Sequence, residues 1–80
     1  MSTFEVLWYA GGPEYAPNRV IARDYIRQHD LTDAIGKACN MLKANRGSHD
    51  GYAHGFYVRK VDLATDKRAA EIVSERGYAR

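Results

Sequence analysis

The chain has 80 residues, a formal net charge of +2 and one cysteine. This length suits a single domain, which we expect over residues 1–80 with loose ends at residues 1–2 and 78–80. The small net charge argues against strong non-specific attraction to nucleic acid, and no apolar run reaches the roughly 18 residues of a membrane span. The first residues lack the pattern of a signal peptide, and Cys39 cannot form an internal disulfide. We therefore expect a soluble protein of a reducing cytoplasm.

The first expected element is a strand over residues 3–9. Phe4, Val6 and Trp8 recur there with a period of two, which is typical of a strand with one buried side. The segment GGPEYAP at residues 11–17 follows, and its glycines and prolines favour a loop that reverses the chain. Together the two segments predict the first half of a hairpin.

The stretch RVIARDYIRQ at residues 19–28 fits either a strand or one face of a helix. Its β-branched and aromatic residues favour a strand, and the first strand needs a partner close by. In such a strand Val20 and Ala22 would face the core, and a bulge or a strand end at Asp24 would keep that carboxylate out of the core. The side chains expected to point outward are Arg19 and Arg23.

Residues 31–45 carry the clearest helical periodicity of the chain. Apolar residues recur there at helical spacing, namely Leu31, Ala34, Ile35, Ala38 and Leu42. Asp30 is suited to cap the N-terminus of this helix, which should stop near Asn45. Cys39 lies on the same helix, where we expect a buried and unreactive thiol.

The last two expected elements are a strand and a second helix. The segment FYVRKV at residues 56–61 alternates in polarity, and the side facing away from the core would hold Tyr57, Arg59 and Val61. The helix is expected to begin at Asp62 or Thr65 and to end at Gly77. Its apolar side is thin, so we expect it to be the most weakly docked element. That side consists of Ala69, Ile72 and Val73.

The order of elements, ββαβα, predicts an α+β fold. We expect a small antiparallel three-stranded sheet in the order 2-1-3, with both helices on one face. The other face of the sheet should then be bare. The side chains expected on it are Leu7, Tyr9, Ile21, Arg23, Tyr57 and Arg59.

No segment of the sequence matches a catalytic or cofactor-binding motif. A metal site or an acid–base pair would have to use His29, His49, His54 and Asp50, and their spacing matches no zinc pattern. The glycines near residue 11 lack the lysine of a phosphate-binding loop. We therefore expect no enzyme activity, no cofactor and no metal.

Tyrosine and arginine are favoured in protein interfaces, and both occur on the face expected to be bare. The residues predicted to bind a partner protein are Arg19, Arg23, Tyr25, Tyr57 and Arg59. The same face, or pairing of edge strands, would also let two copies of this small domain associate as a homodimer.

A second interpretation is a single-stranded nucleic-acid-binding module. The segment GFYVRKV is faintly similar to the aromatic strand of RNA-recognition sheets, where rings stack on bases and basic side chains hold phosphates. It departs from that strand because it is one residue shorter between its glycine and its valine, and the element order also differs. A face with exposed tyrosines and arginines would still stack on and pair with a single strand.

One resemblance extends over most of the chain. The stretch RVIARDYIRQHDLTDAIGKACNMLKA and the later GFYVRKV, in a short chain without catalytic motifs, resemble small phage-encoded regulators, among them anti-CRISPR proteins. The resemblance covers residues 3–62 and transfers no functional residue. It implies a stoichiometric inhibitor in the host bacterial cytoplasm, which docks on a CRISPR–Cas effector and blocks DNA entry or nuclease recruitment.

Overall fold

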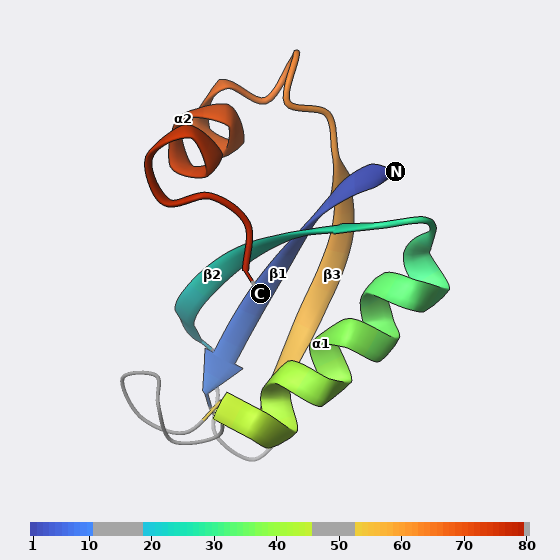
Figure 1. The fold of residues 1–80 in the computed structure, drawn as a ribbon. Helices are drawn as coiled ribbons and strands as arrows, with labels where there is room; N and C mark the ends of the chain where they lie inside the picture. The colour runs from blue at the N-terminus through green and yellow to red at the C-terminus, as the bar shows by residue number, and fades with distance from the viewer. Residues whose placement is uncertain (11–18, 46–52, 80) are drawn as a thin grey trace.

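The computed structural model describes residues 1–10, 19–45 and 53–79. Its elements follow the order ββαβα (Figure 1): β1 Ser2–Ala10, β2 Arg19–Gln28, α1 Leu31–Asn45, β3 Gly55–Val61 and α2 Lys67–Arg76. The three strands are antiparallel in the order β2-β1-β3, which confirms the predicted α+β sheet. Residues 19–28 form a strand, as predicted. The loop expected at residues 11–17 lies outside the described residues.

The inner face of the sheet, the face that α1 covers, carries the hydrophobic core. Its buried side chains are Phe4, Val6, Trp8, Ile26, Ala34, Ala38, Met41 and Ala53. The ring of Trp8 meets that of Phe56 edge-on, with 5.6 Å between centroids. The indole Nε1 of Trp8 donates a hydrogen bond of 2.7 Å to Asp24 Oδ2. Because this bond satisfies the carboxylate, Asp24 stays within β2, and the strand neither ends nor bulges there as predicted.

The helix α1 buries only part of its predicted apolar side: Ala34 and Ala38 are in the core and Leu42 packs against it, as predicted. Its buried side chains are Ala34, Ala38 and Met41. Leu31 and Ile35, which were predicted to join the core, are 49% and 42% exposed, and Cys39 is exposed instead of buried. The large rings of β1 already fill the layer between sheet and helix, so the small side chains of α1 face them.

A bulge in β2 changes which residues face the core. Trp8 pairs with Ala22 and Tyr9 pairs with Val20, so Ile21 has no residue opposite it in β1. Val20 was predicted to face the core and Ile21 to face outward. The extra residue reverses both directions, so Ile21 packs against the core and Val20 shares the face of Tyr9.

Both helices begin at a capping aspartate. Asp30 Oδ1 accepts a hydrogen bond of 2.8 Å from the backbone N–H of Asp33, as predicted. The second cap is Asp66, and the preceding Asp62 closes a turn. The second helix therefore starts after both of its predicted starting points. Within the described residues, no helix has the length and apolar character needed to cross a membrane.

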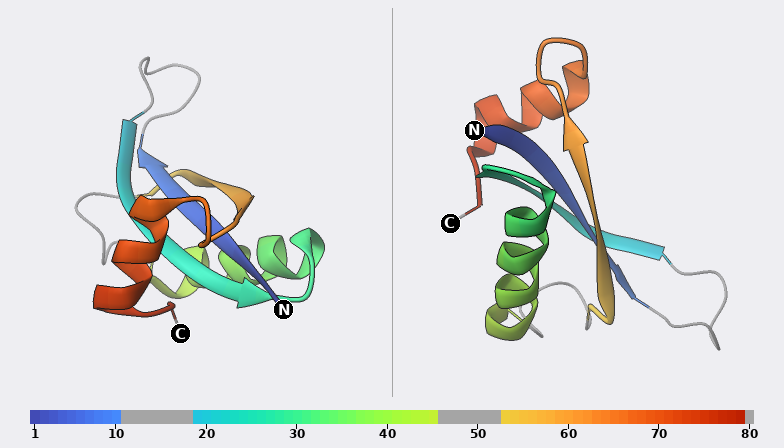
Figure 2. Two further views of the ribbon diagram at one scale, coloured as in Figure 1. Left: turned by 90° about the horizontal axis from the view of Figure 1, so that it is seen from above. Right: turned by 90° about the vertical axis from the view of Figure 1, so that its right-hand side faces the viewer.

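The helix α2 packs on the outer face of the sheet, opposite α1 (Figure 2). Tyr25 and Val61 alternate with inner-face residues, and they form a buried cluster with Ala69 of α2. The expectation that both helices share one face was wrong. The reason is that α1 already covers the inner face, so the apolar side of α2 covers the apolar residues left on the outer one. That side consists of Ala69, Ile72 and Val73, as predicted.

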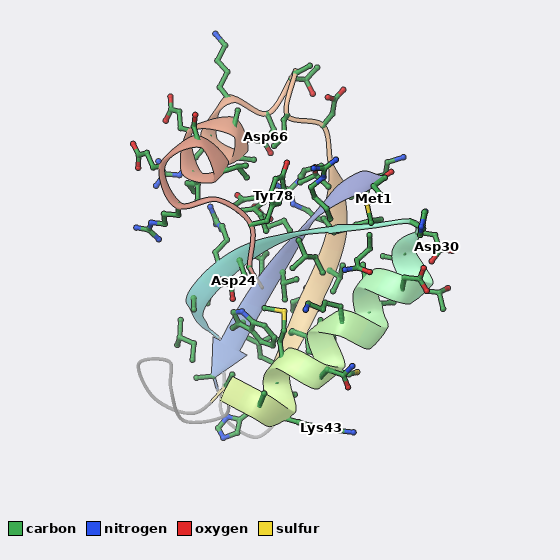
Figure 3. All side chains as sticks on the ribbon, viewed as in Figure 1. Met1, Asp24, Asp30, Lys43, Asp66 and Tyr78 are labelled. Atoms are coloured by element: carbon green, nitrogen blue, oxygen red, sulfur yellow. The ribbon has the colours of Figure 1, made fainter. Side chains whose placement is uncertain are left out.

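After α2 the chain returns to the free edge of β2. The backbone N–H of Ala79 donates a hydrogen bond of 2.7 Å to the carbonyl of Tyr25. The hydroxyl of Tyr78 lies 3.4 Å from Thr3 Oγ1, and the guanidinium carbon of Arg27 lies 5.5 Å from the centre of the Tyr78 ring. These contacts hold Tyr78 and Ala79 against the sheet, although the sequence suggested that this end of the chain would be loose (Figure 3).

Candidate functional site

The outer face consists of cross-strand rows, each with one residue from β2, β1 and β3. In order they are Val20–Tyr9–Gly55, Arg23–Leu7–Tyr57, Tyr25–Glu5–Arg59 and Arg27–Thr3–Val61. The helix α2 and the segment after it pack on the last two rows, which we call the closed half. Among the described residues neither buried cluster includes a member of the first two rows, which we call the open half.

Glu5 lies at the centre of the closed half and is only 2% exposed. Its Oε2 accepts a hydrogen bond of 2.7 Å from the hydroxyl of Tyr25, and its Oε1 accepts one of 2.7 Å from Arg59 Nε. Arg23 Nε lies 3.6 Å from Oε2. Both carboxylate oxygens therefore have donors, which offset the cost of removing the charge from water.

Arg59 connects this carboxylate to α2. Its Nη2 donates a hydrogen bond of 3.2 Å to Asp66 Oδ2, and Asp66 Oδ1 accepts one of 3.0 Å from the backbone N–H of Ala69. Figure 3 labels Asp66 at the start of α2. A continuous set of hydrogen bonds therefore runs from the buried Tyr25 through Glu5 and Arg59 to the first turn of α2.

This network shifts the ionisation of its members. Burial, followed by the hydrogen bond to Glu5, raises the pKa of Tyr25. The same carboxylate raises the pKa of Arg59 through its hydrogen bond. The backbone N–H of Ala69 lowers the pKa of Asp66, and the Arg59 guanidinium acts in the same direction. Each shift favours the state that the network uses at neutral pH, namely a neutral phenol, a cation and an anion.

The open half presents an aromatic pair, of which Tyr57 is exposed and Tyr9 is half-buried. Tyr57 is 62% exposed, and its ring packs against that of Tyr9 with 5.0 Å between centroids and 30° between planes. Gly55 permits this arrangement, because a Cβ at that position would collide with the Tyr9 hydroxyl. The remaining members of the open half are the half-buried Leu7, the exposed Val20 and the bordering Arg23.

Four residues of the predicted site share the outer face: Arg23, Tyr25, Tyr57 and Arg59. Arg23 and Tyr57 lie in the open half, whereas Arg59 forms ion pairs with Glu5 of the closed half and with Asp66 at the start of α2. Tyr25 is 2% exposed beneath α2, so its ring is not available to a partner in this structure. Arg19 begins β2, and its side chain lies outside the described residues.

Some residues that matter to this face were not in the predicted site. Glu5 alternates with Phe4 and Val6 and therefore faces outward, between Tyr25 and Arg59, and the alternation is a signal that the sequence already contained. Val20 was missed because the bulge reverses its direction. Arg68, which also borders the open half, was missed because α2 was expected on the other face.

The predicted candidates for a metal site or an acid–base pair are not brought together in the described part of the chain. No cluster of three or more potential metal ligands occurs among those residues. His29 and His54 lie near opposite ends of β1, and Cys39 is exposed on α1. His49 and Asp50 lie outside the described residues.

Comparisons with models of protein families, with curated proteins and with solved structures found no match. The resemblance to small phage-encoded regulators therefore stays a prediction.

Proposed function

We propose that the protein is a non-catalytic binding protein that docks another protein on the open half of its outer face. The observation that carries the proposal is the exposed ring of Tyr57, which packs on the half-buried Tyr9 beside Leu7 and is bordered by Arg23. Aromatic rings and arginine are favoured at interface centres, because they bury a large area at a low cost in side-chain entropy.

The polar groups of the two halves differ in what they bind, which supports the proposal. In the closed half, Glu5 and Arg59 are used internally, in the attachment of α2. In the open half, Arg23 approaches Glu5 through its Nε at 3.6 Å and interacts with the hydroxyl of Tyr25, and within the described residues no ion pair engages its terminal nitrogens. The terminal nitrogens of Arg23 can therefore donate hydrogen bonds to a partner, as arginines at interfaces commonly do.

CRISPR–Cas effector complexes are the first partners to test. The resemblance to phage-encoded inhibitors implies them, and inhibition by occlusion needs a docking surface but no catalytic residue. In this proposal the open half contacts the effector, while the bulk of the domain blocks DNA entry or nuclease recruitment.

Capture on immobilised protein tests the proposal. Purified effector complexes and a bacterial lysate are passed over the wild type, Tyr57→Ser and Leu31→Ser. Leu31 is an exposed apolar residue of α1, remote from the outer face, and so provides a matched control. We expect a protein that the wild type and Leu31→Ser retain equally, and that Tyr57→Ser retains at less than about a tenth of that level.

Two outcomes would overturn this proposal. The first is a failure of the wild type to retain any protein, and the second is equal retention by Tyr57→Ser. Self-association of the wild type that Tyr57→Ser abolishes would identify a second copy of the chain as the partner and would replace the effector in the proposal.

Single-stranded nucleic-acid binding is a second candidate function, favoured by one observation. The exposed ring of Tyr57 lies in the same row as Arg23 and next to Arg59, and exposed rings beside arginines can stack on bases. Fluorescence anisotropy with labelled oligo-dT and oligo-rU tests it. This function requires binding at low salt that weakens steeply as salt rises and that depends on Tyr57. No binding at low salt would remove it.

A further inference from the structure

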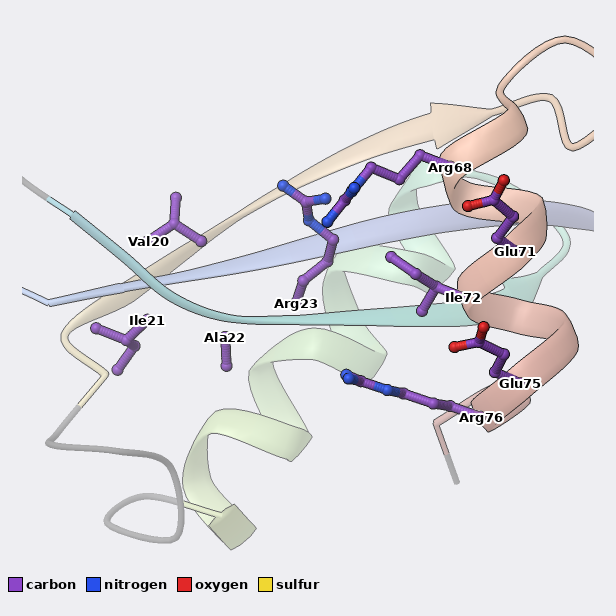
Figure 4. Close-up of a pocket in the computed structure, with 9 residues that line it drawn as sticks. All are labelled: Val20, Ile21, Ala22, Arg23, Arg68, Glu71, Ile72, Glu75 and Arg76. Carbon is purple, nitrogen blue, oxygen red and sulfur yellow. The ribbon is translucent and has the colours of Figure 1, made fainter.

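A cleft runs along the border of the open half, between β2 and α2 (Figure 4). Its volume is about 430 Å³, and Val20 of β2 and Ile72 of α2 supply apolar surface to it. Its charged residues are Arg23, Arg68, Arg76, Glu71 and Glu75. Figure 4 shows Arg68 extending from α2 toward Arg23, so that two guanidinium groups point to the same end of the cleft.

The convergence of these arginines is unfavourable without a negative charge between them. Within the described residues, Arg68 and Arg76 form no ion pair, and Arg23 approaches Glu5 only through its Nε at 3.6 Å. The terminal nitrogens of Arg23 and Arg68 are thus donors for an oxyanion that the described chain does not supply. A guanidinium group presents two parallel N–H bonds, which match the two oxygens of such an anion.

We infer that this cleft receives the carboxylate of an Asp or Glu side chain from the partner protein. The inference rests on the proposed function and adds the chemistry by which the partner is recognised. The carboxylate is held between Arg23 and Arg68, and a neighbouring apolar side chain of the partner packs against Val20 and Ile72.

The charges of the cleft favour a protein carboxylate over the phosphates of a nucleic acid. Glu71 and Glu75 line the same cleft, so its three arginines exceed its two glutamates by only one charge. A row of phosphates would bring repeated negative charges against both glutamates. A single carboxylate meets the arginines alone, and a lysine or arginine beside it in the partner would pair with the glutamates.

Selection from a displayed library of random linear peptides tests the inference. We expect the selected peptides to be enriched in Asp or Glu next to apolar residues. Synthetic copies are then titrated into the wild type, Arg68→Gln and Lys67→Gln. Lys67 is exposed on the same helix but does not line the cleft, so Lys67→Gln removes the same charge as a matched control.

We expect binding to Arg68→Gln to be at least about tenfold weaker, and binding to Lys67→Gln to stay within about twofold of the wild type. Replacing the acidic residue of the peptide by its amide should cause the same loss. The two changes together should cost little more than either alone, because they remove the same contact.

Several results would overturn the inference: no selected peptides, selected peptides without acidic residues, or equal losses in Arg68→Gln and Lys67→Gln. Competition by oligo-dT that depends on Arg68 would assign the cleft to phosphate and overturn it as well. Peptides that need Tyr57 but not Arg68 would refute the carboxylate site and leave the docking function standing. The docking function fails separately, when Tyr57→Ser captures as much partner as the wild type.

Discussion

The two helices are attached to the two faces of the sheet by different kinds of contact. On the inner face, α1 packs small side chains against large rings in an apolar layer. On the outer face, Ala69 is the only buried residue of α2, and a set of hydrogen bonds connects the start of the helix to the sheet. The residues of that set are Asp66, Arg59, Glu5 and Tyr25.

The contact of α1 with the inner face depends on the shapes of the packed side chains. The contact of α2 with the outer face depends also on the direction of its polar groups. The free energy of an apolar layer follows the area and volume that it buries and changes little with pH. A buried carboxylate with its donors depends instead on the presence and the ionisation state of each partner. Changes to the inner face should therefore destabilise the whole domain, whereas changes to the network should first loosen α2.

The largest effect is expected from Trp8→Ala, which breaks the inner contact. The substitution opens a cavity under α1 and takes the indole donor from Asp24, at a cost of about 4 kcal/mol. A domain of this size has a total stability of only about 4–12 kcal/mol. Urea unfolding followed by circular dichroism measures the loss. Leu31→Ala, on the exposed side of α1, should cost less than about 1 kcal/mol, and similar costs for both variants would contradict the described inner face.

The next largest effect is expected from Glu5→Gln, which keeps the shape of the side chain but removes its charge. Arg59 loses its charged acceptor, and we expect a loss of about 2–3 kcal/mol. Hydrogen exchange measures where the loss appears. Amides of α2 should exchange faster while those of α1 keep most of their protection. An equal increase in both helices would mean that α2 is not attached separately.

A smaller loss, about 1.5 kcal/mol, is expected from Tyr25→Phe, which removes one buried hydrogen bond to Glu5. The pKa of Tyr25 is higher in the folded protein than the usual tyrosine value of about 10. The hydrogen bond therefore contributes fully to stability below that usual value, and its contribution is lost as the pH rises toward the higher pKa of the folded protein. Unfolding curves of both proteins at neutral and alkaline pH measure this. The stability difference should shrink above about pH 10, and a difference that is constant with pH would contradict the assignment.

The smallest effect is expected from Asp66, where two variants separate the cap from the ion pair. Asp66→Ala removes the N-cap, and amides in the first turn of α2 should exchange roughly fivefold faster. Asp66→Asn keeps a good cap and loses only the charge toward Arg59, so its effect should be smaller. The pKa of Asp66 is lower in the folded protein than the usual aspartate value. Its carboxylate therefore contributes fully to stability above the usual value, and this contribution is lost as the pH falls below it toward the pKa of the folded protein. Acid sensitivity that persists unchanged in Asp66→Asn would refute this.

The elements and the strand order follow from the sequence because they depend on local patterns. The period of two in β1 and the capping Asp30 before α1 both identify their elements correctly. The predicted outer residues Arg23, Tyr57 and Arg59 do share a face, because alternation fixes the face of each strand residue once the register is known.

Other features depend on volume and long-range pairing, which periodicity does not contain. Leu31 and Ile35 lie on the same broad apolar arc as Ala34 and Ala38, and only the size of the facing rings decides which part of the arc is buried. Likewise, no local signal marks Ile21 as the unpaired residue of the bulge. The burial of Tyr25 could not be predicted either, since it requires α2 to cover the outer face.

The outer face is divided into a closed half that holds α2 and an open half that we propose binds a partner. Stability and partner capture, both measured for Tyr57→Ser and Tyr25→Phe, distinguish the two halves. We expect Tyr57→Ser to lose capture with a stability change below about 1 kcal/mol, and Tyr25→Phe to lose about 1.5 kcal/mol of stability with capture unchanged. Capture that falls in step with stability in both variants would contradict the division.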